Sequence, residues 1–194
     1  MYKQKSIRHF IIPFVMFTSF FSFFSCKELT KKKQNIIEEW YEKKILIPEN
    51  ITFKSMGHDT VCSSILNHHY KVLVYVDSAG CTPCHLMLPE WKTYMSTCER
   101  LAYDVGFLFV VQSNNYRALE QDLYLQHFTY PIIYDSKNEF DKLNQFPKGQ
   151  KYRTFLLDAK NHVVLIGSPI ENIEISALFD KILRGDGDKN NFTK

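Results

Sequence analysis

The 194-residue chain lacks a hydrophobic run of membrane-spanning length, an excess of charge, and a second pair of closely spaced cysteines. Its long apolar run, residues 10–24, is short for crossing a bilayer and contains Pro13, which argues against a permanent transmembrane helix. Residues 1–25 hold three of the 24 basic side chains and no acidic one, so the remainder carries 21 of each sign. Bulk charge therefore does not indicate a nucleic-acid partner.

Residues 1–25 have the features of a secretion signal. A basic segment, residues 1–9, precedes the apolar segment, and a small residue, Ser25, precedes Cys26. The junction resembles a bacterial lipoprotein signal, in which the cysteine is acylated, although Phe23 replaces the usual leucine; an ordinary cleaved signal is the alternative. The resemblance implies a protein lipid-anchored through Cys26 to the cell envelope, at the outer membrane, with its domain in the periplasm or outside. Disulfides persist there.

The rest of the chain divides into three parts. Residues 26–50 are rich in charge and predict a tether followed by a short amphipathic helix over 35–46. Residues 51–184 predict the folded domain, starting with a β-hairpin that turns at residues 57–59. Residues 185–194 are polar and predict a disordered tail.

The pattern within 51–184 predicts an α/β fold with a central mixed sheet flanked by helices. Residues 70–77 are almost continuously aliphatic or β-branched, as a strand buried on both faces requires. Helix, strand, helix and strand patterns alternate after it, over residues 85–101, 105–112, 115–128 and 130–135. A helical turn over 138–146, a hairpin over 154–167 and an amphipathic helix over 171–184 complete the domain.

The feature that carries chemistry is Cys81-Thr82-Pro83-Cys84-His85. This spacing suits c-type haem attachment, half of a zinc site, or a redox-active dithiol. Cys81 follows a buried strand and opens the next helix, where unpaired N–H groups and the positive helix end stabilise a thiolate. Cys84 lies one helical turn further and can close a disulfide with Cys81. The context favours the redox pair.

The stretch resembles the thioredoxin superfamily, over residues 51–184, and within it the membrane-anchored thiol-disulfide oxidoreductases, which include reductases of cytochrome c maturation and thiol antioxidant proteins. Four features support the likeness: the strand running into Cys81-x-Pro-Cys84, Pro89 five residues later, the strand-turn-strand over 154–164, and an insertion over 128–146. The resemblance implies a thioredoxin-like fold with an N-terminal hairpin extension. It also implies that Cys81 attacks, that Cys84 resolves the mixed disulfide, and that Pro89 kinks the helix.

Three positions depart from the family pattern. Gly80 replaces the tryptophan before the first cysteine, and Tyr75 replaces a buried carboxylate or amide. Tyr152 stands at the position of the family's cis-proline, which shapes the backbone that binds substrate. Gly80, Tyr152 and Arg153 are therefore expected to line the approach to the sulfur. Specificity and redox potential are expected to differ from those of thioredoxin.

Other chemistries fit the sequence less well. Haem attachment would use Cys81, Cys84 and His85 but needs a helical scaffold, and a zinc site needs four ligands. A peroxiredoxin would have proline and threonine where this chain has Val74 and Ser78. No metal or other cofactor is therefore expected. Two further cysteines, Cys62 and Cys98, are interpreted as structural, and a disulfide between them stays open.

The sequence thus predicts an envelope thiol-disulfide oxidoreductase. Its expected partners are cysteine-containing envelope proteins, an upstream thiol reductant or oxidant, and the membrane, through its lipid anchor. The alternative is a redox-inactive binding or assembly lipoprotein of the same fold, in which Cys81 and Cys84 form a fixed disulfide; metal delivery and peroxidase activity are weaker alternatives.

Overall fold

A computed structural model describes residue 31 and residues 34–78 and 86–185. Two compact units divide the chain, the first comprising residues 1–39 and the second residues 40–194. Within the first unit, residues 34–39 are helical, and Gln34 Nε2 donates to Glu38 Oε1 at 3.1 Å. No helix among the described residues is both long enough and apolar enough to cross a membrane.

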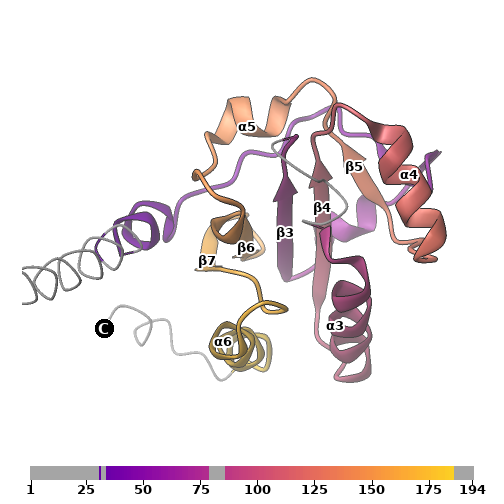
Figure 1. Cartoon of the computed structure of the whole chain (residues 1–194). Coiled ribbons are helices and arrows are strands. Elements are labelled where there is room, and N and C mark those ends of the chain that lie inside the picture. Colours follow the sequence, from indigo (N-terminus) through magenta and orange to yellow (C-terminus); the bar gives the residue numbers. More distant parts are fainter. Residues whose placement is uncertain (1–30, 32–33, 79–85, 186–194) are drawn as a thin grey trace, which may run out of the picture. The chain divides into compact units, whose positions relative to one another are not determined.

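The second unit contains a mixed sheet in which seven described strands follow the order β2-β1-β5-β4-β3-β6-β7 (Figure 1). The strands are β1 (Phe53–Ser55), β2 (His58–Thr60), β3 (Tyr70–Val76), β4 (Val105–Val111), β5 (Ile132–Tyr134), β6 (Thr154–Leu157) and β7 (Val163–Ile166). The helices are η1 (Ser63–Asn67), α3 (Leu88–Arg100), α4 (Tyr116–Leu125), α5 (Glu139–Asn144), η2 (Gln150–Tyr152) and α6 (Ile173–Leu183).

The central strand is β3, as its apolar sequence predicts. It pairs in parallel with β4 over its whole length, from Tyr70↔Val105 to Val76↔Val111, and antiparallel with β6. Every β3 residue from Lys71 to Val76 is buried. The predicted fold class is confirmed, including the hairpin extension, because β1 and β2 form a hairpin whose first strand pairs with β5.

Alternate residues of the strands face two different layers. On one face, Val72, Val74 and Val76 of β3 belong to a core with residues of α3, α4 and α6. On the other face, Tyr75 stacks on Phe146 at 4.5 Å between ring centroids, and Phe146 stacks on Trp40 at 5.8 Å. The central sheet is therefore covered on both sides.

Two predicted boundaries near the start of the domain are wrong. The helix expected over 35–46 ends at Trp40, because the next residues pair with β7 and with the turn just before it. Glu42 N donates to Val163 O at 2.9 Å, and Ile45 N donates to Asn161 O at 2.8 Å. The hairpin turn lies at Met56 and Gly57, whose φ angles of 50° and 86° suit a tight two-residue turn. His58 and Asp59, expected in the turn, lie in β2.

Replacing Trp40 tests whether the residues before the hairpin belong to the folded unit. The side chain is 1% exposed and contacts the rings of Phe146 and Phe155. Trp40→Ala should lower the free energy of unfolding by about 3–5 kcal/mol in urea denaturation, since it leaves a large cavity. Tyr124→Ala, at a 66% exposed aromatic residue, is the control and should cost less than about 0.5 kcal/mol. Equal losses in both variants would contradict this packing.

Candidate functional site

The candidate site begins where β3 ends. Val76 is the last residue of this strand, Asp77 and Ser78 follow, and α3 begins at Leu88. The predicted site residues Gly80, Cys81 and Cys84, like the proposed lipid attachment residue Cys26, lie outside the described residues. The structure describes the residues on either side of the motif in sequence, at the end of β3 and at the start of α3.

Two glutamine residues hold the backbone at the end of β3. Gln112 N donates to Val76 O at 2.8 Å, and the Gln112 side-chain oxygen accepts from Ser78 N at 2.9 Å. On the other side, Gln150 Nε2 donates to Tyr75 O at 2.9 Å. Peptide groups on both flanks of the strand are therefore satisfied, and the direction in which the chain leaves the sheet is defined.

Arg153 lies beside this strand end and pairs with Asp77. The guanidinium Nη1 contacts Asp77 Oδ2, Nε donates to Pro147 O at 2.9 Å, and the guanidinium carbon lies 5.6 Å from the centroid of the Tyr75 ring. Tyr75 N donates to Arg153 O at 2.9 Å, which brings the two segments together. The Arg153 and Asp77 side chains are only 12% and 25% exposed. That Arg153 lines the approach to Cys81 stays a prediction.

Tyr152 lies just before β6, and Pro89 lies in α3, the helix that follows the motif in sequence. Tyr152 ends the short helix η2, and Lys151 Nζ lies 4.9 Å from its ring centroid. The described residues contain no cis peptide bond. Pro89 is the second residue of α3, which begins at Leu88 directly after Met87 in a left-handed conformation with φ of 47°. A proline at that place gives up no helical hydrogen bond, because the N–H groups of the first turn have no partner within the helix.

Tyr75 is a poor proton acceptor. Its ring is 1% exposed, and its hydroxyl donates to Asn138 Oδ1 at 2.7 Å. Burial, followed by the nearby carboxylates, of which Asp141 has the largest effect, raises the pKa of Tyr75 far above its ordinary value. The phenol therefore stays protonated at physiological pH, so Tyr75 cannot serve as the proton acceptor that a carboxylate at this position would provide.

The two remaining cysteines of the domain lie apart from the candidate site. Cys62 precedes η1 and is partly exposed, Cys98 lies in α3 and is buried, and both are free thiols. Cys62 lies outside the β1–β2 hairpin, because β2 ends at Thr60. No group of three or more His, Cys, Asp or Glu residues suited to a metal occurs in the described ranges. His68 pairs through Nδ1 with Asp104 Oδ1 at 2.7 Å.

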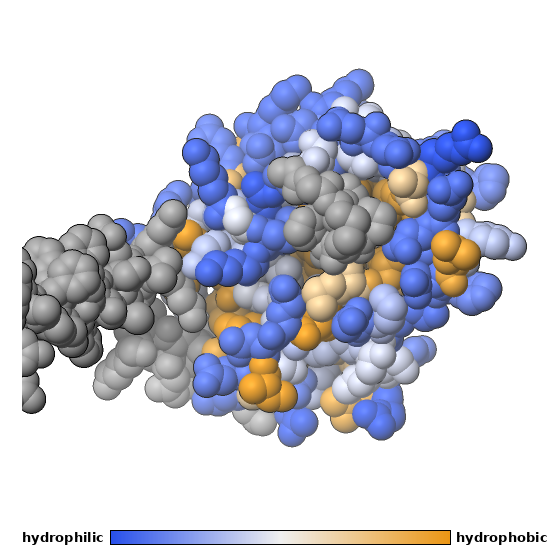
Figure 2. Space-filling model, viewed as in Figure 1, coloured by the Kyte–Doolittle hydropathy of each residue, from blue (hydrophilic) through white to orange (hydrophobic). Residues whose placement is uncertain are grey.

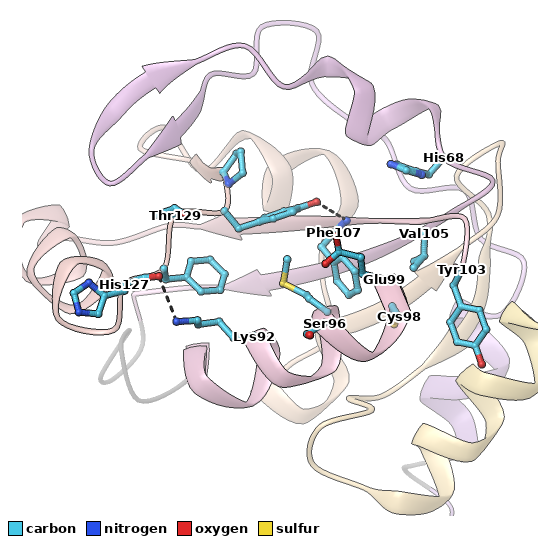
Figure 3. A pocket seen from close by; sticks show the side chains of 14 residues that line it. His68, Lys92, Ser96, Cys98, Glu99, Tyr103, Val105, Phe107, His127 and Thr129 are labelled. Atoms are coloured by element: carbon cyan, nitrogen blue, oxygen red, sulfur yellow. Dashed lines mark hydrogen bonds between the residues drawn. The ribbon is translucent and has the colours of Figure 1, made fainter. Parts of the chain in front are cut away.

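A pocket of about 670 Å³ lies along α3, from Lys92 to Glu99 (Figure 3). Its lining includes Met95, Cys98 and Glu99 of α3 together with Val105 and Phe107 at the amino end of β4. Because β3 and β4 are parallel, the pocket lies toward the amino ends of these strands, whereas the candidate site lies at the carboxyl end of β3.

The surface seen in Figure 2 is mainly hydrophilic where residues are described, with hydrophobic side chains in several separate patches.

Three residues at the site were missed by reasoning from the sequence. Asp77 has a visible signal, because it is an acidic residue at the end of an apolar strand and four residues before Cys81. Gln112 and Gln150 have none, since their hydrogen bonds join residues that are 34 and 75 positions apart. Only the folded sheet brings them to the end of β3.

Comparison with known proteins shows the fold. No family model matches the chain, and no curated protein is similar enough in sequence to be matched. Among solved structures, a protein from Chlorobium tepidum assigned as the thiol:disulfide interchange protein DsbE is 18% identical, with a TM-score of 0.55. The match covers 76% of this chain and 99% of that one.

Two further structures agree with this match. The thioredoxin domain of a thiol-disulfide oxidoreductase from Bacteroides vulgatus is 12% identical, with a TM-score of 0.54 over 74% of this chain and 97% of that one. A cysteine-to-serine mutant of PrxQ from Xylella fastidiosa is 13% identical, with a TM-score of 0.54 over 76% and 97%. The chain therefore has a thioredoxin-like fold, as the sequence predicts.

The burial of Cys98 predicts a difference in thiol reactivity. Burial raises the pKa of Cys98 to about 11, so this thiol stays protonated and inaccessible at pH 8. Iodoacetamide at pH 8 should label the partly exposed Cys62 in the folded protein, whereas Cys98 should be labelled only after denaturation. Peptide mass mapping gives the labelled fraction at each position. Labelling of Cys98 as fast as Cys62 in the folded protein would show that the core around α3 opens readily.

Proposed function

We propose that this chain is a thiol-disulfide oxidoreductase in which Cys81 is the nucleophile and Cys84 resolves the mixed disulfide. The observation that supports this is the place of the motif in the chain. Cys81-x-x-Cys84 lies between the end of the central strand β3 and the start of helix α3 in a thioredoxin-like fold. Carboxyl ends of parallel strands are where α/β folds hold ligands, and a nearby helix start stabilises a thiolate.

The proposed reaction needs no metal or organic cofactor. In the reducing direction, the Cys81 thiolate attacks one sulfur of a substrate disulfide, and the other substrate sulfur leaves as a thiolate and takes up a proton. The Cys84 thiolate then attacks Cys81, which releases the second substrate sulfur and forms the Cys81–Cys84 disulfide. Two electrons reach the substrate. A dithiol donor reduces the pair again, and the same steps in reverse oxidise a substrate.

The contacts described at the end of β3 support this reaction. A thiol-exchange site must present one sulfur in a fixed direction, and the bonds from Gln112 and Gln150 define how the chain leaves the sheet. Arg153 is held at the same end of β3 by Asp77 and Pro147. From there its side chain would be able to contact the backbone of a bound substrate. Proposed substrates are envelope proteins with accessible cysteines or disulfides, and an upstream envelope thiol protein would exchange electrons with the pair.

A redox-inactive binding module is the second candidate function. The observation that favours it is Tyr75, whose buried hydroxyl donates to Asn138 and cannot accept a proton at physiological pH. Without a neighbouring side chain to accept its proton, Cys84 would need another way to form the thiolate that attacks Cys81. In this candidate function the Cys81–Cys84 disulfide is permanent, and the fold serves to bind a partner.

The proposed location is the cell envelope, at the outer membrane, with Cys26 as the site of lipid attachment. Two or more acyl chains would hold the domain at a membrane, since each buried CH₂ contributes about 0.8 kcal/mol. The folded unit begins at Trp40, so only a short segment would separate it from the bilayer. Proteins attached to or near the same membrane would then be the accessible substrates.

Removing the resolving thiol tests the proposed reaction. Cys84→Ser should accumulate a stable mixed disulfide between Cys81 and a disulfide-bonded peptide, because no second thiol releases it. The wild type should release the peptide as a dithiol, and Cys81→Ser should form no adduct at the motif. Cys62→Ser is the matched control and should behave as the wild type. If Cys81 forms no adduct at any of several pH values, the proposal is wrong.

Replacing Cys26 tests the proposed anchor. Wild-type protein expressed in a bacterial host should partition into the detergent phase, and its amino-terminal peptide should carry the mass of acyl chains. Cys26→Ala should lose both properties, whereas Cys62→Ala, a change at a cysteine within the domain, should keep them. Detergent partition and acyl mass that survive in the Cys26 variant would refute lipid attachment at this residue.

A further inference from the structure

The pocket of about 670 Å³ beside α3 has no role in the proposed reaction (Figure 3). Ligand sites in proteins commonly have volumes of about 300–1,000 Å³, with a mainly apolar lining and a few polar groups that orient the ligand. The apolar part of this lining comes from α3, from β4 and from the segment between α4 and β5: Met95, Val105, Phe107, Phe128 and Pro131. The pocket therefore has the size and the lining of a small-molecule site.

One face of α3 supplies the polar groups of the pocket. Its lining residues Lys92, Met95, Ser96 and Glu99 recur at the i, i+3, i+4 and i+7 spacing of a single helix face. Lys92 and Glu99 are separated by seven residues, which places them about 10 Å apart along the helix axis at 1.5 Å per residue. Figure 3 shows Lys92 toward one end of the pocket and Glu99 toward the other. The pocket thus has opposite charges at its two ends.

The cation at the first end is available to a ligand. Lys92 Nζ donates to Gln126 O at 3.0 Å and to His127 O at 3.4 Å, two carbonyl oxygens just after α4. An ammonium group has three donors, so one is left for a ligand. Lys92 forms no ion pair with any residue that the structure describes. The lysine therefore presents an uncompensated positive charge to the pocket.

The carboxylate at the other end is available as well. Two charged groups close to it already have partners: His68 Nδ1 pairs with Asp104 Oδ1 at 2.7 Å, and Arg184 Nε donates to the Tyr103 hydroxyl at 2.9 Å. Within the described part of the chain, Glu99 takes part in no ion pair. A cationic group of a ligand would therefore meet this carboxylate.

We propose that the pocket binds a short peptide of about three residues with an apolar central side chain. The carboxylate of the peptide contacts Lys92, its apolar side chain packs against Met95 and Phe107, and its ammonium group contacts Glu99. An extended chain advances about 3.3 Å per residue, so three residues span about 10 Å, which matches the separation of the two charges on α3.

The experiment titrates the full chain in detergent with a tripeptide, alanine, para-fluorophenylalanine and alanine, whose binding is followed by fluorine NMR with detergent alone as the blank. At about pH 6.5 the amino terminus of the peptide is charged. Saturable binding with a dissociation constant of about 10 μM to 1 mM is expected. Amidating the carboxyl end or acetylating the amino end should each weaken binding about two- to fivefold, because each removes one solvent-accessible ion pair.

Two variants assign the ends of the peptide. Lys92→Gln, which keeps a donor for the carbonyl groups after α4, should bind the free and the amidated peptide equally and still prefer the free amine over the acetylated one. Glu99→Gln should show the reverse. Met95→Trp fills the pocket and should abolish binding. Lys160→Gln and Glu171→Gln change exposed charges outside the lining, and these controls should match the wild type.

Three results would overturn the inference: no saturable binding by the wild type, loss of both end preferences in a single variant, or full binding by Met95→Trp. Urea unfolding shows whether Met95→Trp folds, and if it does not, the exchanged preferences of Lys92→Gln and Glu99→Gln still decide. None of these residues takes part in the proposed thiol exchange. Peptide binding without any adduct at Cys81 would reject only the proposed function, and exchange without peptide binding would reject only this inference.

Discussion

The way β3 leaves the sheet is the constraint on which the rest of the site depends. β3 lies between β4 and β6, is paired along its length with β4, and is buried from Lys71 to Val76. A strand held on both edges cannot shift its register without moving its apolar side chains to the wrong faces. The position and direction of the chain at Asp77 therefore follow from the packing of the whole sheet.

The same packing connects the start of the folded unit to this strand end. Trp40, Phe146 and Tyr75 stack in sequence on one face, and the guanidinium of Arg153 lies over Tyr75. Residues 42–45 add hydrogen bonds to Val163 of β7 and to Asn161 just before it, which covers this edge of the sheet. Residues just after the expected tether thus support the face of the sheet that lies beneath Tyr75.

Much of the fold could be predicted from the sequence because its signals are local. Continuous apolar residues predicted β3 and β4, and the strand-turn-strand pattern over 154–167 predicted the β6–β7 hairpin. The helix that ends at Trp40 was overextended because the pairing of residues 42–45 with β7 is a tertiary contact. Local helical periodicity carries no information about a partner more than a hundred residues away.

The candidate site was predicted less completely than the fold. Arg153 was identified through its place next to Tyr152, and the structure puts it at the end of β3. The sequence analysis missed its partner Asp77, and it missed Gln112 and Gln150, which hydrogen-bond to the backbone at the end of β3. The roles of these residues depend on which segments become neighbours in the fold. Sequence motifs identify the reacting atoms, whereas the surrounding charges and hydrogen bonds emerge only from the sheet order.

The midpoint potential of the cysteine pair tests the central claim most directly. The full chain would be equilibrated across a glutathione redox series, free thiols trapped by alkylation, and Cys81 and Cys84 read by mass. The account predicts a reversible two-electron transition between about −270 and −120 mV, the range of thioredoxin-fold catalysts. A pair that stays oxidised below about −300 mV would contradict it and identify a fixed structural disulfide.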